Sequence, residues 1–324
     1  MQTALRSLNS DSIIGINDLR RFIKGWILDG EYRQLSPRTL ELRRHFLNKL
    51  VWWLEHEGFE SCGTFEIRAF IGYVSNGHQS EKGRWGNPAL KTAVKSRTVK
   101  DVHGSLRTFF RFLVAEGYIP ASPMEGLRPP IHRPDQIQPF TEEQVQTLLK
   151  ASKASQQSRR DEAIFLFMLD SGVRVSELCE LDFQDVDIVN RKAVVRGKGN
   201  KHRAIYFSRE TGRVLWRYLR ERELEPESPL FESKRGERLT RYGVRQLLER
   251  LGETAKIEAV RCSPHTVRHT FAVMFLRAGG SVFTLKEMLG HTDLAMTNRY
   301  VTLAQADIQN QHRQFSPVQA LKRR

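Results

Sequence analysis

Four short stretches in the second half of the chain combine basic residues, histidines and a tyrosine in a way that suits chemistry on a phosphate ester. They read SGVRVSEL, RGKGNKHR, SPHTVRHTF and LGHTDLAMTNRY. Positively charged donors can stabilise the charge that develops on phosphate oxygens, a role that divalent ions fill at other sites. A tyrosine hydroxyl can act as the nucleophile. The candidate catalytic residues are Arg174, Lys198, His265, Arg268, His291 and Tyr300.

Each of these residues has a plainer interpretation when it is taken alone. Arg174 stands near a predicted helix start, where an arginine is usually a surface cation. Lys198 lies in a predicted hairpin, and the segment from Arg191 to Arg203 holds six Lys and Arg residues and no acidic one. Such a turn could be solvated, or its tip could contact phosphate. An isolated tyrosine near a chain end, such as Tyr300, is more often a packing residue than a nucleophile.

His265 and His269 stand at i and i+4 on a predicted helix, which is the spacing of a zinc-binding pair. The metalloprotease pattern requires glutamate directly after the first histidine, but that residue is Thr266. We therefore expect no metal site. His265 and Arg268, at i and i+3, instead offer two neighbouring donors to the oxygens of one phosphate. A His265 packed in the core is the alternative.

The four stretches, in this order, resemble the signature boxes of the tyrosine recombinases, or phage integrase family. The resemblance rests on SGVRVSEL, GKGNK, HTVRHTFA, and LGH followed by a tyrosine nine positions later, from 291 to 300. The interval of 24 residues between Arg174 and Lys198 is similar to that of the Xer-like, two-domain members. The close resemblance covers Thr141 to Leu303, and the N-terminal half is similar in pattern only.

This resemblance implies a site-specific DNA recombinase, or integrase, that cleaves and rejoins double-stranded DNA through a 3′-phosphotyrosine. Tyr300 would attack the scissile phosphate, and Arg174 and Arg268 would hold its non-bridging oxygens. Lys198 would give a proton to the departing 5′-oxygen. The exchange of one phosphodiester for another conserves bond energy, so no ATP, metal or other cofactor is expected.

The remaining positions of the motifs have implied roles too. His291 would add a donor to the phosphate, and His265 would assist proton movement at the nucleophile. Glu177, three residues after Arg174 on the same helix face, resembles the family's acidic position and would orient that arginine through a buried ion pair.

The biological role stays open between integration or excision of a mobile element, which we favour, and Xer-type resolution of chromosome or plasmid dimers. A type IB topoisomerase uses similar chemistry, but the spacing of the motifs favours recombination. A non-catalytic DNA-binding protein would not need Tyr300, and a zinc hydrolase lacks its ligand pattern. Accessory proteins that set the direction of recombination are possible partners.

Composition agrees with a nucleic-acid partner. The 324 residues contain 52 Lys and Arg against 37 Asp and Glu, a formal net charge of +15, and such a field favours polyanions. The three cysteines, Cys62, Cys179 and Cys262, form no CxxC pair, so neither a disulfide framework nor a thiolate metal site is predicted. No apolar run is long enough for a membrane span and no export signal is apparent. We expect a bacterial or archaeal cytoplasmic protein that acts at the nucleoid.

Helical spacing of apolar residues predicts an all-α N-terminal half, a core-binding (DNA-binding) domain over residues 1–120. Its clearest helix has Ser36 as the N-cap, Pro37 at the first position and a stop at Gly58. The expected DNA contacts in this half lie on its last helix: Lys100, Arg107 and Arg111. The Gly-rich stretch from His78 to Lys95 is either a solvated loop or a loop that DNA orders.

Residues 121–138 are rich in proline and predict a linker. The catalytic domain, residues 139–311, is predicted to be α+β, mainly helical with a small antiparallel sheet. Thr141 and Gln144 form a capping box at its first helix. The sheet strands are LDFQDVDI, AVVRG and RAIYF, and Lys201 and Arg203 beside the GKGNK turn are further expected DNA contacts.

The last segment, residues 312–324, is predicted to be a C-terminal tail that joins subunits. Phe315, Val318 and Leu321 recur at i, i+3 and i+6, which makes one short apolar stripe on a helix. Such a stripe could dock in a neighbouring subunit and support a homotetramer on DNA. The alternatives are that it packs on its own domain or frays.

Overall fold

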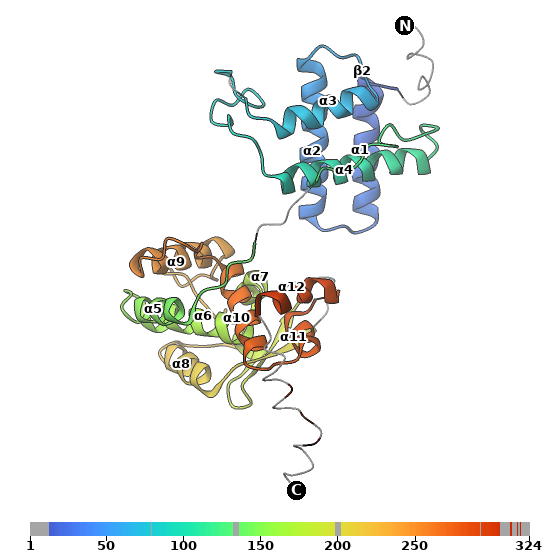
Figure 1. Cartoon of the computed structure of the whole chain (residues 1–324). Helices are drawn as coiled ribbons and strands as arrows, with labels where there is room; N and C mark the ends of the chain where they lie inside the picture. The colour runs from blue at the N-terminus through green and yellow to red at the C-terminus, as the bar shows by residue number, and fades with distance from the viewer. Residues whose placement is uncertain are drawn as a thin grey trace. The chain divides into compact units, whose positions relative to one another are not determined.

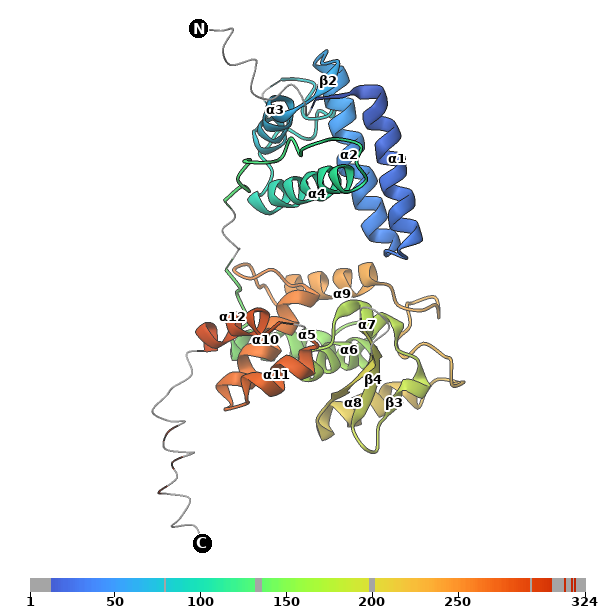
Figure 2. The same cartoon turned by 90° about the vertical axis from the view of Figure 1, so that its right-hand side faces the viewer.

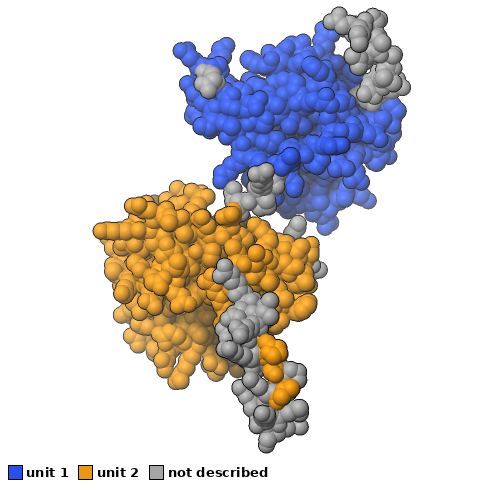
Figure 3. Space-filling view, viewed as in Figure 1, with its two compact units in different colours: residues 1–135 blue, residues 136–324 orange. Residues whose placement is uncertain are grey.

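The chain divides into two compact units, residues 1–135 and 136–324, coloured separately in Figure 3. The computed structural model describes residues 13–78, 80–131, 136–197, 202–291 and 293–304, with His312, Ser316 and Val318. Lys198, Lys201 and most of the predicted tail lie outside the described residues. The division between the units falls inside the segment 121–138 that the sequence predicts as a linker. Each unit is considered by itself below.

The N-terminal unit is a helical bundle, which confirms the predicted fold class. Helices α1 and α2 run side by side, and α4 lies across both of them (Figures 1 and 2). Their apolar faces meet in one core that includes Leu19, Trp26, Leu50, Phe70 and Phe109. The four helices are α1 (Ile16–Tyr32), α2 (Pro37–His56), α3 (Thr64–Ser75) and α4 (Ser96–Ala115).

Local sequence signals fix the start of α2 as predicted. The Ser36 side chain accepts a hydrogen bond from the Thr39 amide at 3.2 Å, and Pro37 occupies the first turn. The prediction of an all-helical unit is wrong in one detail, because β1 (Ile14–Gly15) pairs antiparallel with β2 (Ser61–Cys62). Strands of two residues are too short to show an alternating pattern in the sequence.

Most described residues of the segment from His78 to Lys95 are exposed, as a solvated loop requires, but the side chains of Arg84 and Trp85 pack on the N-terminal unit. Arg84 is 3% exposed and donates to the carbonyl oxygens of Asn76 and Thr92. The Trp85 ring lies against Trp52, Phe70 and Tyr73. These contacts of Arg84 and Trp85 anchor the middle of the segment to the N-terminal unit.

The C-terminal unit is α+β, also as predicted. Helices α6 and α10 pass through its centre, and α5, α8 and α9 surround them (Figure 1). A capping box between Thr141 and Gln144 opens the first helix. The helices are α5 (Glu142–Lys153), α6 (Ser158–Ser171), α7 (Val175–Glu180), α8 (Arg209–Leu219), α9 (Arg241–Thr254), α10 (Pro264–Arg277), α11 (Val282–Leu289) and α12 (Leu294–Ala304).

A three-stranded antiparallel sheet of order β3-β4-β5 completes this unit (Figure 2). In β4 (Lys192–Arg196) and β5 (His202–Tyr206), Val195 pairs with Arg203 and Ala193 with Ile205. LDFQDVDI is only partly a strand, because Phe183–Asp185 form a 3₁₀ turn and β3 covers Val186–Asp187. The Asp185 carboxylate accepts from the Asp182 amide, which favours the turn over a longer strand.

Two glycines end helices where the chain must turn toward the site. Gly172 ends α6 at φ 60° and Gly290 ends α11 at φ 61°, a left-handed conformation that favours glycine. A Cβ on Gly172 would also lie 2.2 Å from the Phe271 ring. These two turns place Arg174 beside the Gly290–His291 segment, where Arg174 donates to the Gly290 carbonyl.

Among the described residues, no helix is long and apolar enough to cross a membrane.

Candidate active site

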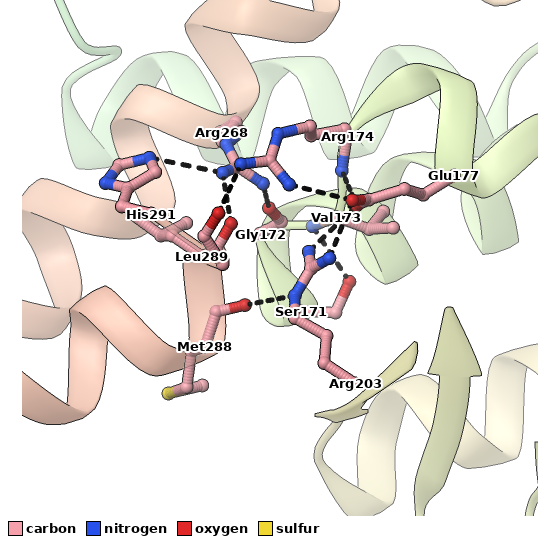
Figure 4. Close-up of polar contacts among 11 residues, drawn as sticks. Ser171, Gly172, Val173, Arg174, Glu177, Arg203, Arg268, Met288, Leu289 and His291 are labelled. Carbon is pink, nitrogen blue, oxygen red and sulfur yellow. Dashed lines mark hydrogen bonds and ion pairs between the residues drawn. The ribbon is translucent and has the colours of Figure 1, made fainter. Parts of the chain in front are cut away.

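Arg174 is held by Glu177 from the same helix start. It is the N-cap residue of α7, and its amide donates to Glu177 Oε2 at 2.9 Å while its Nη1 donates to Glu177 Oε1 at 2.8 Å. Its Nη2 donates to the Gly290 carbonyl at 2.7 Å. The expected ion pair is therefore present, and it aims the guanidinium across the unit toward the turn after α11 (Figure 4).

Arg203 has a different place from the one expected for it. Its Nη1 and Nη2 donate to the two oxygens of Glu177 at 2.6 and 2.8 Å, and its Nε donates to the Met288 carbonyl at 3.1 Å. Its side chain is only 16% exposed. Both ends of the fork and the Nε are engaged within the protein, so Arg203 orients Glu177 and connects β5 to α11. Its expected contact with DNA stays a prediction.

Arg268 on α10 is buried and fixed by backbone carbonyls. Its Nη1 donates to Gly172 at 2.6 Å and its Nη2 to Leu289 at 2.7 Å. Burial, with the nearby charge of Arg174, lowers the pKa of Arg268 to about 10, so the side chain stays charged at neutral pH. A guanidinium has five N–H donors, and these contacts leave some of them free for a ligand.

His291 follows the Gly290 turn and contacts Arg268. The distance from Arg268 Nη2 to His291 Nε2 is 3.3 Å, and His291 Nδ1 lies 2.9 Å from the Thr297 hydroxyl. An arginine can only donate, so Nε2 is the acceptor and the ring proton is on Nδ1. Burial and the charge of Arg268 lower the pKa of His291 to about 4. The expected donation from His291 to a phosphate thus requires protonation or a rearrangement when DNA binds.

Tyr300 packs in the core, as one of the two interpretations expects, and its role as nucleophile stays a prediction. Its ring packs with Phe271, Leu276 and Leu289 in a small apolar cluster, and the residue is 4% exposed. Its hydroxyl, however, lies 2.7 Å from Nδ1 of His269. Burial raises the pKa of Tyr300. The tyrosine is thus a core residue with a polar tip inside the site.

His265 lies one helical turn before His269 on α10. His265 is exposed, and its ring centroid is 6.4 Å from that of His269. In the part of the chain that the structure describes, it makes no hydrogen bond to Tyr300, so the Tyr300 hydroxyl contacts the second histidine of the pair instead of the first. The i, i+4 spacing of the two histidines is the sequence signal that places both rings on the face of α10 that meets Tyr300. No group of three or more His, Cys, Asp or Glu among the described residues could hold a metal ion.

The expected basic contacts of the N-terminal unit lie on one exposed face of α4. Lys100, Arg107 and Arg111 are all exposed, whereas Val99, Leu106 and Phe110 of the same helix are buried. The face is therefore available to a ligand. Lys198 and Lys201 fall in the segment 198–201 between β4 and β5, outside the described residues.

The assembled site has an excess of positive charge. Among the described residues, Arg174, Arg203 and Arg268 face one carboxylate, that of Glu177. Burial alone would raise the pKa of Glu177, but hydrogen bonds from Arg203 and Arg174 outweigh it and hold that pKa below its usual value. Two positive charges are left without a carboxylate, beside a tyrosine hydroxyl. Such a site can bind a phosphate diester and attack it.

Known proteins are similar to this chain in sequence and in fold. A sequence model of the phage integrase family matches residues 138–307, just over half of the chain. The chain belongs to the phage integrase family of tyrosine recombinases. It is thus a DNA breaking and rejoining enzyme, and the resemblance seen in its motifs is confirmed.

The recombinase is similar over most of its length to several relatives. It is 32% identical to the tyrosine recombinase XerC of Alcanivorax borkumensis, covering 84% of this chain and 85% of that protein. It is 28% identical to XerC of Oceanobacillus iheyensis, covering 93% and 98%. Its fold resembles that of the Tn1549 transposon integrase in complex with a circular intermediate DNA, with a TM-score of 0.67, 20% identity and coverage of 89% and 94%.

Replacement of Glu177 by glutamine is expected to destabilise the catalytic unit by roughly 3 kcal/mol, because it leaves Arg174 and Arg203 without their carboxylate. Urea unfolding of the full chain measures this change. Glu249→Gln is the matched control, since Glu249 pairs with Arg245 on the surface of α9, where an ion pair contributes little. Equal stability of Glu177→Gln and wild type would contradict the assignment of Glu177 as the organising anion.

Proposed function

We propose that the recombinase performs site-specific strand exchange with Tyr300 as its nucleophile. The observation that carries this proposal is the tyrosine hydroxyl inside a cluster of arginines that lacks enough carboxylates to neutralise it. Tyr300 Oη attacks the scissile phosphorus, and the bond from that phosphorus to the 5′-oxygen breaks. The products are a 3′-phosphotyrosine and a free 5′-hydroxyl. Attack by a 5′-hydroxyl of the partner strand reverses the step and releases Tyr300.

The arginines stabilise the pentavalent transition state. Arg174 and Arg268 are held by main-chain carbonyls and by Glu177, so their remaining N–H donors are oriented before the substrate arrives. Lys198 delivers a proton to the departing 5′-oxygen. Because Tyr300 is 4% exposed, neighbouring side chains must move to admit the phosphate to its hydroxyl. Lys100, Arg107 and Arg111 on α4 contact the DNA backbone, and Lys201 extends the contacts from the hairpin.

We assign the biological role to the integration and excision of a mobile element, acting in the cytoplasm at the nucleoid. The fold likeness to a transposon integrase supports this role. Xer-type dimer resolution is the second candidate, which the similarity to proteins named XerC favours. Domain limits of 1–120 for the DNA-binding domain and 139–311 for the catalytic domain, with a linker between them, suit a protein that contacts DNA with both parts.

Tyr300→Phe is expected to bind DNA as wild type does but to form no covalent adduct, because it lacks only the attacking oxygen. The measurement is a denaturing gel after incubation with nicked genomic fragments. Sequencing of the DNA that wild type traps decides the role: ends of a mobile element support integration, and a single chromosomal site supports dimer resolution. An adduct formed by the Phe variant would show that Tyr300 is not the nucleophile.

Lys198→Ala is expected to slow cleavage of ordinary DNA by about 100-fold or more, because the 5′-oxygen then leaves without a proton. A substrate with a 5′-bridging sulfur should be cleaved at nearly the wild-type rate, since a thiolate leaves without protonation. Single-turnover cleavage of both substrates measures the ratio. Equal slowing on the two substrates would mean that Lys198 only positions the DNA.

The tail, residues 312–324, is proposed to join subunits into a homotetramer on DNA. Of its apolar stripe only Val318 lies among the described residues, and it is exposed, so a neighbouring subunit can reach it. A chain truncated after Gln311 is therefore expected to bind and cleave DNA but to lose assembly of synaptic complexes, as measured by native gels and light scattering. Strand exchange at the full rate by the truncated protein would overturn this assignment.

A further inference from the structure

The hydroxyl of Tyr300 contacts a histidine that is not among the six catalytic positions implied by the family motifs. His269 Nδ1 lies 2.7 Å from Tyr300 Oη, within the range of a strong hydrogen bond. The two ring centroids are 5.5 Å apart. His269 stands on α10 and Tyr300 on α12, and these helices pack on each other through a shared apolar cluster. The contact is thus fixed by the fold of the catalytic unit.

We propose that His269 is the proton acceptor for Tyr300, the role that the motifs had suggested for His265. This inference rests on the proposed function. When Tyr300 Oη bonds to phosphorus, its O–H bond breaks and the proton moves to His269 Nδ1. The bond from phosphorus to the 5′-oxygen breaks in the same step, and that oxygen takes a proton from Lys198. Rejoining returns both protons, so no further reactant is needed.

The surroundings of His269 keep its ring unprotonated, so that Nδ1 has a lone pair to accept the hydrogen bond from Tyr300. Burial, with His265, Arg299 and Arg268, lowers the pKa of His269 to about 4. The groups that face it are Arg268 and His265 on its own helix, Arg299 and Tyr300 on α12, and His291 from the turn after α11. In the described part of the chain, none of these groups is a carboxylate that would hold a proton on the ring.

Tyr300 needs such an acceptor more than an exposed tyrosine does. Burial raises the pKa of its hydroxyl, so loss of the proton to water at neutral pH is rare. With a base within hydrogen-bond reach, Tyr300 does not have to lose its proton to water before it attacks. General bases commonly contribute about 10²- to 10⁴-fold to a rate. His265 is exposed and lies one turn away on α10, so it is the poorer candidate.

The test compares three full-length variants with wild type: His269→Gln, His269→Ala and His265→Gln. Glutamine can accept the hydrogen bond from Tyr300 but cannot take its proton. The probe is a nicked duplex that carries the genomic sequence trapped by wild type, and the readout is the single-turnover rate of adduct formation. DNA affinity and unfolding temperature show whether each variant is folded. Both His269 variants are expected to react about 100-fold more slowly than wild type.

The pH dependence of this rate separates proton transfer from simple packing. Wild type should be nearly independent of pH from about pH 6 to about pH 8.5, because His269 is already neutral there. Without His269, Tyr300 must ionise before it attacks, so the rate should rise about tenfold per pH unit. His265→Gln removes a candidate phosphate donor and should lower the rate, but this rate should not rise with pH as the rates of the His269 variants do.

Difluorotyrosine at position 300 gives a second, chemical readout. Its hydroxyl is more acidic than that of tyrosine, so it depends less on a base. It should restore most of the rate lost in His269→Gln while changing little in wild type. The inference is wrong if the His269 variants react within about threefold of wild type, if their profiles stay flat, or if difluorotyrosine gives no rescue. A wild-type protein that forms no adduct would instead overturn the proposed function, and the inference with it.

Discussion

The catalytic unit depends on one buried carboxylate among several guanidinium groups. Glu177 is 3% exposed and binds Arg174 and Arg203. The charges of these three residues also act on the pKa of Arg268 nearby. Buried charges are tolerated only when they are paired and hydrogen-bonded. The chain pairs some of this charge with Glu177 and leaves the rest to a ligand. A phosphate diester, which carries one negative charge, is the complement that the site lacks.

This charge excess also controls the histidines. Burial together with the arginines lowers the pKa values of His269 and His291 to about 4, so both rings are neutral at physiological pH. The neutral His291 accepts from Arg268, and the neutral His269 meets the Tyr300 hydroxyl. Each neutral ring has a nitrogen lone pair that can accept a hydrogen bond. The positive charge of the arginines therefore keeps both histidines available as acceptors.

Much of the fold followed from local signals in the sequence. The N-cap at Ser36, the capping box at Thr141 and the helical apolar periods each act within a few residues, and the structure has them where they were predicted. The pairing of Ile14 with Cys62 and the contacts of Arg203 depend on residues far apart in the chain. Periodicity has no information on such contacts. Arg203 stands in a basic hairpin and therefore suggested a DNA contact, although its partner is a carboxylate 26 positions earlier.

The motif positions could be found from the sequence because residue type and order define them, but the partner of the nucleophile could not. The arginines have one further property. Gly172, Leu289 and Gly290 hold Arg174 and Arg268 through carbonyl oxygens, which every amino acid possesses. Mutation at Leu289 changes a side chain without removing its acceptor. The shell around these arginines thus depends on backbone conformation, most strongly at the two glycines, and a substitution that keeps this conformation leaves the acceptors of both guanidinium groups in place.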